Sequence, residues 1–243
     1  MIKNKRVIAV TLARGGSKRV PGKNKALICG KPLIQYTIDE VKKSKYIDEY
    51  VIASDDIDII KIANENKCSS YKRLSVPDTQ TSSSGITTCL IAMYSLEHLR
   101  TMHDTIIVEV MCTNPLKTVD DIDGTIEKLF EGDSAVSVSQ IWDNHPSRVK
   151  YIGDNELKDF YPEIPESRRQ DLTPNAYVRN GSVYAMWWKD LESNETRLSG
   201  KVIPYIMPAS RTLNIDEPND LELAKINVAN ILEKSKKIKY IVV

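Results

Sequence analysis

Strand-like and helix-like segments alternate along this 243-residue sequence, and this alternation limits its fold more than any other feature. Apolar runs typical of strands buried on both faces occur at residues 6–12, 49–53, 105–110 and 135–138. Segments with helical spacing of apolar residues lie at 33–45, 55–63, 82–96 and 118–129. Strands joined by crossover helices pair in parallel. The sequence therefore predicts an α/β protein, a three-layer α/β/α fold with a mostly parallel sheet, in a single domain over residues 1–243.

Residues 140–180 interrupt this alternation. The segment is punctuated by Pro146, Pro162, Pro165 and Pro174. The turn-forming triplet G-D-N at 153–155 predicts a β-hairpin between residues 149–152 and 156–157. A long irregular insertion is typically functional or an interface. We therefore expect residues 140–180 to form an insertion, or arm, on the domain.

The C-terminal part of the sequence returns to regular patterns. Apolar runs predict that the sheet resumes at residues 182–186 and again near 202–203. A proline at the first helical position is favourable, so the last helix is expected to start near Pro218. Residues 231–243 alternate basic and apolar side chains, which predicts either a frayed tail or an added edge strand.

Charge and composition exclude several classes of protein. The 34 Lys and Arg balance 33 Asp and Glu, so there is no excess of positive charge for binding nucleic acid. No apolar run approaches the roughly 20 residues of a membrane span, and the N-terminal run is too short for a secretory signal. Four Cys without a C-x-x-C pair and three His argue against the common zinc sites. We expect a cytoplasmic protein without nucleic-acid or membrane partners.

A cationic loop at residues 13–24 joins the first predicted strand to the first predicted helix, where open α/β sheets bind ligands. It carries four cations, Arg14, Lys18, Arg19 and Lys23, together with three glycines. Glycines let backbone N–H groups approach an anion, and the cations neutralise its charge. The loop therefore predicts a polyphosphate site, the alternative being a solvated basic loop. Its letters match neither G-x-x-x-x-G-K-[ST] nor G-x-G-x-x-G.

The same loop resembles the N-terminal signature of the CMP-sialic acid synthetases (acylneuraminate cytidylyltransferases), and in part that of the CMP-Kdo synthetases. The matching letters are A-R-x-x-S-K-x-x-P-x-K-N at 13–24 and G-K-P-L at 30–33. Later landmarks follow in the same order: S-D-D at 54–56, T-N-P-L-K at 113–117, H-P-x-R at 145–148, N-G-S-V-Y at 180–184 and N-I-D at 214–216. The resemblance covers nearly the whole chain.

The resemblance implies a nucleotidyltransferase fold and a reaction. CTP and an acidic 2-keto-3-deoxy sugar, such as a sialic, legionaminic or pseudaminic acid, would give a CMP-sugar and pyrophosphate with Mg²⁺ as cofactor. It also implies a homodimer formed through the arm, which could reach a partner's active site. Two alternatives stay open: a nucleotidyltransferase for another nucleotide or a non-sugar acceptor, and a catalytically weak homologue that only binds nucleotide sugars.

The resemblance also assigns roles to residues. It implies that Lys23, Arg14 and Asp216 are catalytic, with Lys23 beside the α-phosphate. The implied nucleotide-binding residues are Ala13, Arg14, Gly15, Gly16, Ser17, Lys18, Lys23, Asn24, Arg73 and Ser82. Asp216 and Asn214 lie two residues apart and would share one face of a strand, as metal ligands can. The family pattern has an acid at Asn214, so Asp216 is the principal metal candidate; the alternative role for Asp216 is capping the turn before Pro218.

Acceptor recognition depends on arginines, because an Arg fork matches the carboxylate of a sugar acid. The candidate substrate-binding residues are Arg148, Arg169, Arg179 and Asn180. Each arginine could equally form a surface or interface salt bridge. Met111-Cys112 stands where many family members carry Gln-Pro, and this departure leaves the identity of the acceptor open.

Overall fold

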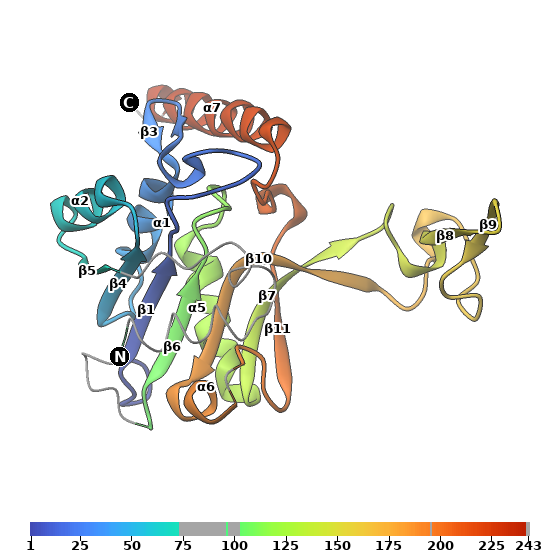
Figure 1. Cartoon of the computed structure of the whole chain (residues 1–243), viewed down its shortest axis with the longest axis horizontal. Helices are drawn as coiled ribbons and strands as arrows, with labels where there is room; N and C mark the ends of the chain where they lie inside the picture. The colour runs from blue at the N-terminus through green and yellow to red at the C-terminus, as the bar shows by residue number, and fades with distance from the viewer. Residues whose placement is uncertain (73–95, 97–102, 195, 242–243) are drawn as a thin grey trace.

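A seven-stranded sheet forms the centre of the protein (Figure 1). The structure is a computed structural model and describes residues 1–72, 96, 103–194 and 196–241. The strands are ordered β11-β7-β10-β6-β1-β4-β5. Their bounds are β1 (Val7–Leu12), β4 (Glu49–Ser54), β5 (Ser69–Lys72), β6 (Ile106–Val110), β7 (Ser134–Ile141), β10 (Ala176–Trp187) and β11 (Val202–Ile206). Only β10 pairs antiparallel within the described sheet, so the predicted mostly parallel sheet is confirmed.

Helices cover both faces of the sheet. The α-helices of the described residues are α1 (Leu33–Val41), α2 (Ile57–Glu65), α5 (Val119–Lys128), α6 (Trp188–Asn194) and α7 (Pro218–Ile241), and the first four pack on the sheet. Helices α1, α2 and α5 pack on one face with Val7 and Ala9, whereas α6 packs on the other with Ile8 and Val10. The strand runs are continuously apolar because successive residues are buried on opposite faces. The three-layer α/β/α fold is therefore confirmed.

Short elements connect these layers. They are η1 (Lys23–Lys25), β2 (Leu27–Ile28), β3 (Lys31–Pro32), η3 (Leu129–Glu131), η4 (Pro146–Arg148), η5 (Arg169–Asp171) and η6 (Ala209–Arg211). Because β1, β4 and β6 are parallel, the loops that follow them meet at one edge of the sheet. That edge holds the cationic loop.

Helix α7 corrects one prediction. It continues to Ile241, so the frayed tail or edge strand predicted for residues 231–243 is wrong over its described part. No Gly or Pro interrupts this segment, and its Leu, Glu and Lys residues are good helix formers. Ala224 and Val228 anchor the helix in one apolar cluster with Leu33. The helix predicted at 82–96 lies outside the described residues, apart from Leu96.

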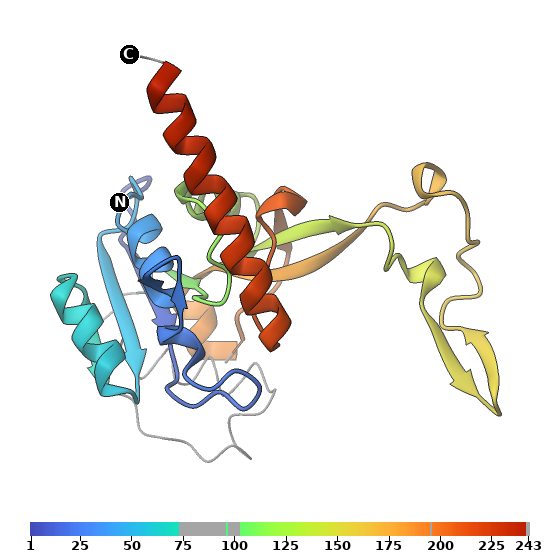
Figure 2. The same cartoon turned by 90° about the horizontal axis from the view of Figure 1, so that it is seen from above.

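An arm projects from the body between β7 and β10 (Figures 1 and 2). Its tip is an antiparallel hairpin of β8 (Lys150–Gly153) and β9 (Glu156–Asp159). Asp154 and Asn155 have φ of 55° and 62°, the left-handed pair that a tight hairpin turn requires. The hairpin prediction is therefore confirmed. No helix of the described residues has the length and apolar content needed to cross a bilayer.

Candidate active site

The cationic loop is tied to the strand beside it. The Ala13 N–H donates to the carbonyl of Ala53 at 2.9 Å, and the Gly15 N–H donates to Asp55 Oδ1 at 2.7 Å. A Cβ on Gly15 would lie 2.8 Å from the Cβ of Asp56, so only glycine allows this approach. The predicted phosphate donor Gly15 thus already bonds a carboxylate. A phosphate would have to compete with Asp55 for that N–H group.

The outer part of the loop faces solvent. Arg14, Gly16 and Lys18 are exposed, and Ser17 is half-buried. Arg19 forms an ion pair with Glu217 at 2.9 Å, and both side chains are more than half exposed. This pair links the loop to the start of α7. The loop therefore presents cationic side chains beside the last helix, while its base is fixed to β4.

Asn24 is buried beneath the loop, and both polar atoms of its amide form hydrogen bonds. Its Nδ2 donates to the carbonyl of Arg14 at 2.9 Å, and its Oδ1 accepts from the Cys112 thiol at 3.1 Å. Burial raises the pKa of Cys112, so the thiol keeps its proton and remains a donor. These contacts favour a role in shaping the loop rather than in touching the nucleotide. Sequence reasoning noted Cys112 only as part of the Met111-Cys112 departure from the family pattern, not as a hydrogen-bond donor to Asn24.

Lys23 and Asp216 meet although 193 residues separate them. Lys23 Nζ donates to the carbonyl of Ile215 at 2.5 Å and to Asp216 Oδ1 at 3.1 Å. The lysine side chain is 12% exposed and the aspartate 52% exposed, so the pair stands at the mouth of the site. Asn214 Nδ2 donates to the other oxygen of Asp216 at 2.5 Å. The structure therefore brings together Lys23, Asp216 and Asn214, although residues 214–216 do not form the strand that the sequence suggested.

Asp220 holds this acidic segment in place. Its Oδ2 accepts from the backbone N–H groups of Asp216 and Glu217, at 2.9 and 2.8 Å. These two hydrogen bonds hold the pKa of Asp220 below its ordinary value. Sequence reasoning missed this residue. The available signal was an acid at the third residue of the helix that starts at Pro218, a position from which carboxylates cap helix N-termini.

The segment T-N-P-L-K at 113–117 forms hydrogen bonds with neighbouring elements inside the protein. Asn114 Nδ2 donates to Ser182 Oγ at 2.7 Å and to the carbonyl of Arg211 at 2.9 Å. Lys117 is buried and donates to Thr37 Oγ1 at 2.7 Å, and burial lowers its pKa to about 8. Both side chains point into the protein. The segment therefore joins α1, β10 and the strand end of β6 rather than facing a ligand.

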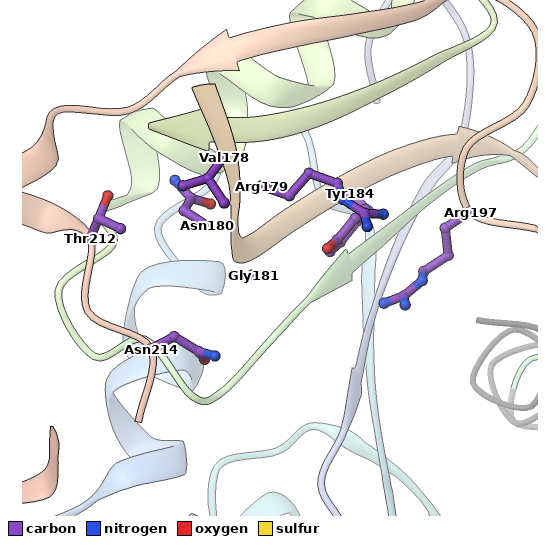
Figure 3. Close-up of a pocket in the computed structure, with 8 residues that line it drawn as sticks. All are labelled: Val178, Arg179, Asn180, Gly181, Tyr184, Arg197, Thr212 and Asn214. Carbon is purple, nitrogen blue, oxygen red and sulfur yellow. The ribbon is translucent and has the colours of Figure 1, made fainter. Parts of the chain in front are cut away.

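A pocket of about 370 Å³ lies beside Asn214 (Figure 3). Its lining residues are Val178, Arg179, Asn180, Gly181, Tyr184, Arg197, Thr212 and Asn214. Asn214 both lines the pocket and bonds Asp216, so it joins the two regions. The register of β10 shifts between Arg179 and Tyr184, and Gly181 adopts a φ of 62° within this bulge. The bulge turns the N-G-S-V-Y segment toward the pocket.

The two predicted acceptor residues on β10 differ in their surroundings. Asn180 is buried; its Oδ1 accepts from Ser137 Oγ at 2.7 Å and its Nδ2 donates to Ser139 Oγ at 3.0 Å. Asn180 therefore shapes the bulge. Arg179 is exposed, lines the pocket and forms no ion pair with a described residue. Of the candidates within the body, Arg179 is the cation placed to meet an acid.

Arg148 and Arg169 lie in η4 and η5, in the arm between β7 and β10, and neither lines the pocket. Arg148 Nη2 donates to the carbonyl of Ser167 at 3.1 Å, and its Nε lies 3.7 Å from Glu166. Arg169 stacks over the Trp142 ring at 4.8 Å. The contacts of Arg148 and Arg169 are with other residues of the arm and not with the Lys23–Asp216 pair. The predicted nucleotide-binding residues Arg73 and Ser82 lie outside the described residues.

These features define a class of protein. A three-layer α/β/α fold places a cationic loop at the carboxyl end of β1, and a carboxylate from the far end of the chain faces that loop. The arrangement is that of a nucleotidyltransferase. The likeness in fold is also measured: CMP:2-keto-3-deoxy-manno-octonic acid synthetase complexed with CTP superposes with a TM-score of 0.67, covering 93% of this chain and 99% of that one at 19% identity.

Sequence comparison then identifies the family. A family model described as cytidylyltransferase matches residues 8–168. The pseudaminic acid cytidylyltransferase of Campylobacter jejuni is 30% identical, covering 90% of this chain and 94% of that protein. The CMP-N,N'-diacetyllegionaminic acid synthase of Legionella pneumophila is also 30% identical, covering 90% of this chain and 95% of that protein. The chain belongs to the cytidylyltransferase family.

Proposed function

We propose that the protein transfers CMP from CTP to an acidic 2-keto-3-deoxy sugar of the nonulosonic acid class and releases pyrophosphate. The relatives named above act on pseudaminic and legionaminic acids, which belong to this class. The observation that carries the proposal is the Lys23–Asp216 contact. This pair lies next to the cationic loop, which suits a triphosphate, and is linked through Asn214 to the pocket that contains Arg179.

The chemistry follows from this placement. The anomeric hydroxyl oxygen attacks the α-phosphorus of CTP in line, the bond to the pyrophosphate oxygen breaks, and the hydroxyl proton passes to solvent. Arg14 and Lys18 neutralise the outer phosphates, and Lys23 meets the charge that develops at the α-phosphate. Arg179 pairs with the carboxylate of the sugar. Positioning and charge neutralisation dominate phosphoryl-group transfers, so no imidazole base is needed at the site.

Magnesium is the cofactor we propose. The described residues contain no cluster of three or more His, Cys, Asp and Glu that could hold a metal by themselves. The half-exposed Asp216 and the amide of Asn214 instead offer one or two oxygen ligands, which suits an ion that keeps phosphate oxygens and waters as its other ligands. Bound there, magnesium would neutralise phosphate charge. Asp216 is the principal ligand in this proposal, and Asn214 the second.

Pyrophosphate release tests the function directly. The protein would be incubated with each nucleoside triphosphate, Mg²⁺ and a panel of nonulosonic acids. We expect release with CTP only, and a CMP-sugar of the added acid as the second product. Release with another triphosphate would replace CTP by that nucleotide. No release with any combination would refute the enzyme and favour a homologue that only binds nucleotide sugars.

The arm supports a second proposal, a homodimer. A two-stranded hairpin is marginally stable in water by itself, yet the side chains of Ile152 and Leu157, which face each other across the strands, are 78% and 71% exposed. Phe160 and Tyr161 beside them are also exposed. A patch of apolar side chains that is exposed in a single chain is typical of a surface that binds another protein. We propose that a second copy of the chain covers them.

Sedimentation equilibrium tests this dimer. We expect wild-type protein to be dimeric at micromolar concentration and Ile152→Asp to be monomeric, because a buried unpaired charge costs several kcal/mol. Ile57→Asp is the matched control, since Ile57 is 71% exposed at the start of α2, where an acid is favourable. It should remain dimeric. A monomeric wild type, or a dimeric Ile152→Asp, would contradict the proposal.

A further inference from the structure

A buried carboxylate interrupts the apolar core beside the pocket. Glu109 lies on the central strand β6 and is 3% exposed. Its register partners are Val10 on β1 and Tyr184 on β10. Ile107, two residues earlier on the same face, belongs to the apolar cluster formed there. Burial raises the pKa of Glu109, as expected for a carboxylate in apolar surroundings.

Arg197 compensates this charge and also reaches the pocket. Its Nη1 donates to both oxygens of Glu109, at 3.3 and 3.2 Å. Its guanidinium lies 4.6 Å from the centre of the Tyr184 ring, and its side chain is 19% exposed. Figure 3 shows Arg179 and Arg197 with Tyr184 among the residues that line the pocket. Contacts with Glu109 and Tyr184 thus hold the guanidinium at the pocket.

The two pocket arginines differ in whether a carboxylate of the protein compensates their positive charge. Glu109 neutralises Arg197, whereas no described residue forms an ion pair with Arg179. A ligand carboxylate placed on Arg197 would face the charge of Glu109 across the same guanidinium, and like charges at such a distance repel strongly in a low dielectric. A neutral oxygen meets no such penalty, because it needs only the N–H dipole.

We propose that Arg197, held by Glu109, is a specificity-determining residue that donates a hydrogen bond to a neutral oxygen of the acceptor, while Arg179 takes its carboxylate. This inference rests on the proposed function. If Arg179 binds the carboxylate, the oxygen that accepts from Arg197 must lie elsewhere on the acceptor. The preferred acceptor is therefore a sugar acid that carries an acylamino carbonyl or a hydroxyl oxygen away from its carboxylate. An acceptor with only an alkyl group there leaves the guanidinium without that bond.

A double variant tests the pair without leaving a buried charge unpaired. Glu109→Leu with Arg197→Met replaces the ion pair by apolar side chains of similar size, a change that is often neutral or stabilising. Each acid that wild-type protein turns over would be compared with analogues lacking one oxygen substituent. Wild type should prefer the parent over one such analogue by about 10²-fold in kcat/KM, as expected for a lost charge-assisted hydrogen bond. The double variant should reduce that preference to below about threefold.

Two further variants separate specificity from a structural role. Arg197→Lys keeps a cation beside Glu109 and should retain part of the preference. Arg179→Met should raise the KM for every acid and leave the preference unchanged. A merely structural pair would instead lower the thermal midpoint and affect all acids equally. A double variant that keeps the wild-type preference overturns this inference alone; wild-type protein that turns over no acid overturns the proposed function and this inference together.

Discussion

Lys23→Ala is expected to lower the rate of CTP-dependent pyrophosphate release by about 10²–10³-fold, the loss typical of removing one preorganised group that meets transition-state charge. Lys23 Nζ is held by the carbonyl of Ile215 and by Asp216, so its charge is positioned before the nucleotide arrives. Single-turnover measurement with saturating CTP isolates the chemical step. The thermal midpoint should stay close to that of wild type, because the pair with the half-exposed Asp216 adds little stability.

Lys25→Ala is the matched control for this variant. Lys25 lies in the same short helix η1, but it pairs with Asp56 and Asp58 at 2.9 and 2.7 Å, away from Asp216. Because Lys25 is paired with these acids and the proposal gives it no contact with the nucleotide, the rate should stay within about threefold of wild type. Equal losses in both variants would mean that the loop only needs positive charge. A Lys23→Ala protein with more than a tenth of the wild-type rate would remove Lys23 from the mechanism.

The parts of the fold that the sequence predicted are those with one dominant physical cause. Strands β1, β4 and β6 could be found because burial on both faces demands a continuous apolar run. The family resemblance assigned roles to Lys23 and Asp216 separately, but no pattern in the sequence indicated that the two side chains are in contact. By contrast, the β10 strand begins at Ala176 instead of Ser182. Residues 176–179, before the bulge, belong to the strand because they pair with β7. No local sequence pattern indicates this pairing.

The contacts that sequence reasoning did not predict join residues that are distant in the sequence. Arg197 meets Glu109 88 residues earlier, and the one signal was an acid inside an apolar run. Asn180 matched a motif, but its amide turned out to bond Ser137 and Ser139 within the fold. Residue type alone does not tell whether a side chain faces a ligand or the protein. Arg148 likewise matched a motif, but its side chain contacts Ser167 and Glu166 of the arm.

Asp216→Asn is expected to lower the rate of pyrophosphate release by about 10²–10³-fold, for two physical reasons. The amide keeps the shape of the side chain but removes the charge opposite Lys23 Nζ, 3.1 Å away. It also removes the negative ligand that we propose for Mg²⁺. The Mg²⁺ concentration that gives half-maximal rate should therefore rise, whereas the backbone N–H bond from residue 216 to Asp220 is retained and the fold with it. Titration of Mg²⁺ at fixed CTP measures the shift.

Glu217→Gln is the control that makes this result specific to position 216. Glu217 is the next residue, carries the same charge and pairs with Arg19 at 2.9 Å, but both partners are more than half exposed. Its loss should change the rate by less than about threefold and leave the Mg²⁺ dependence unchanged. If both variants shift the Mg²⁺ dependence alike, the segment acts through its total charge. If Asp216→Asn keeps the wild-type Mg²⁺ dependence but loses rate, Asp216 serves only to hold Lys23, and the metal has other ligands.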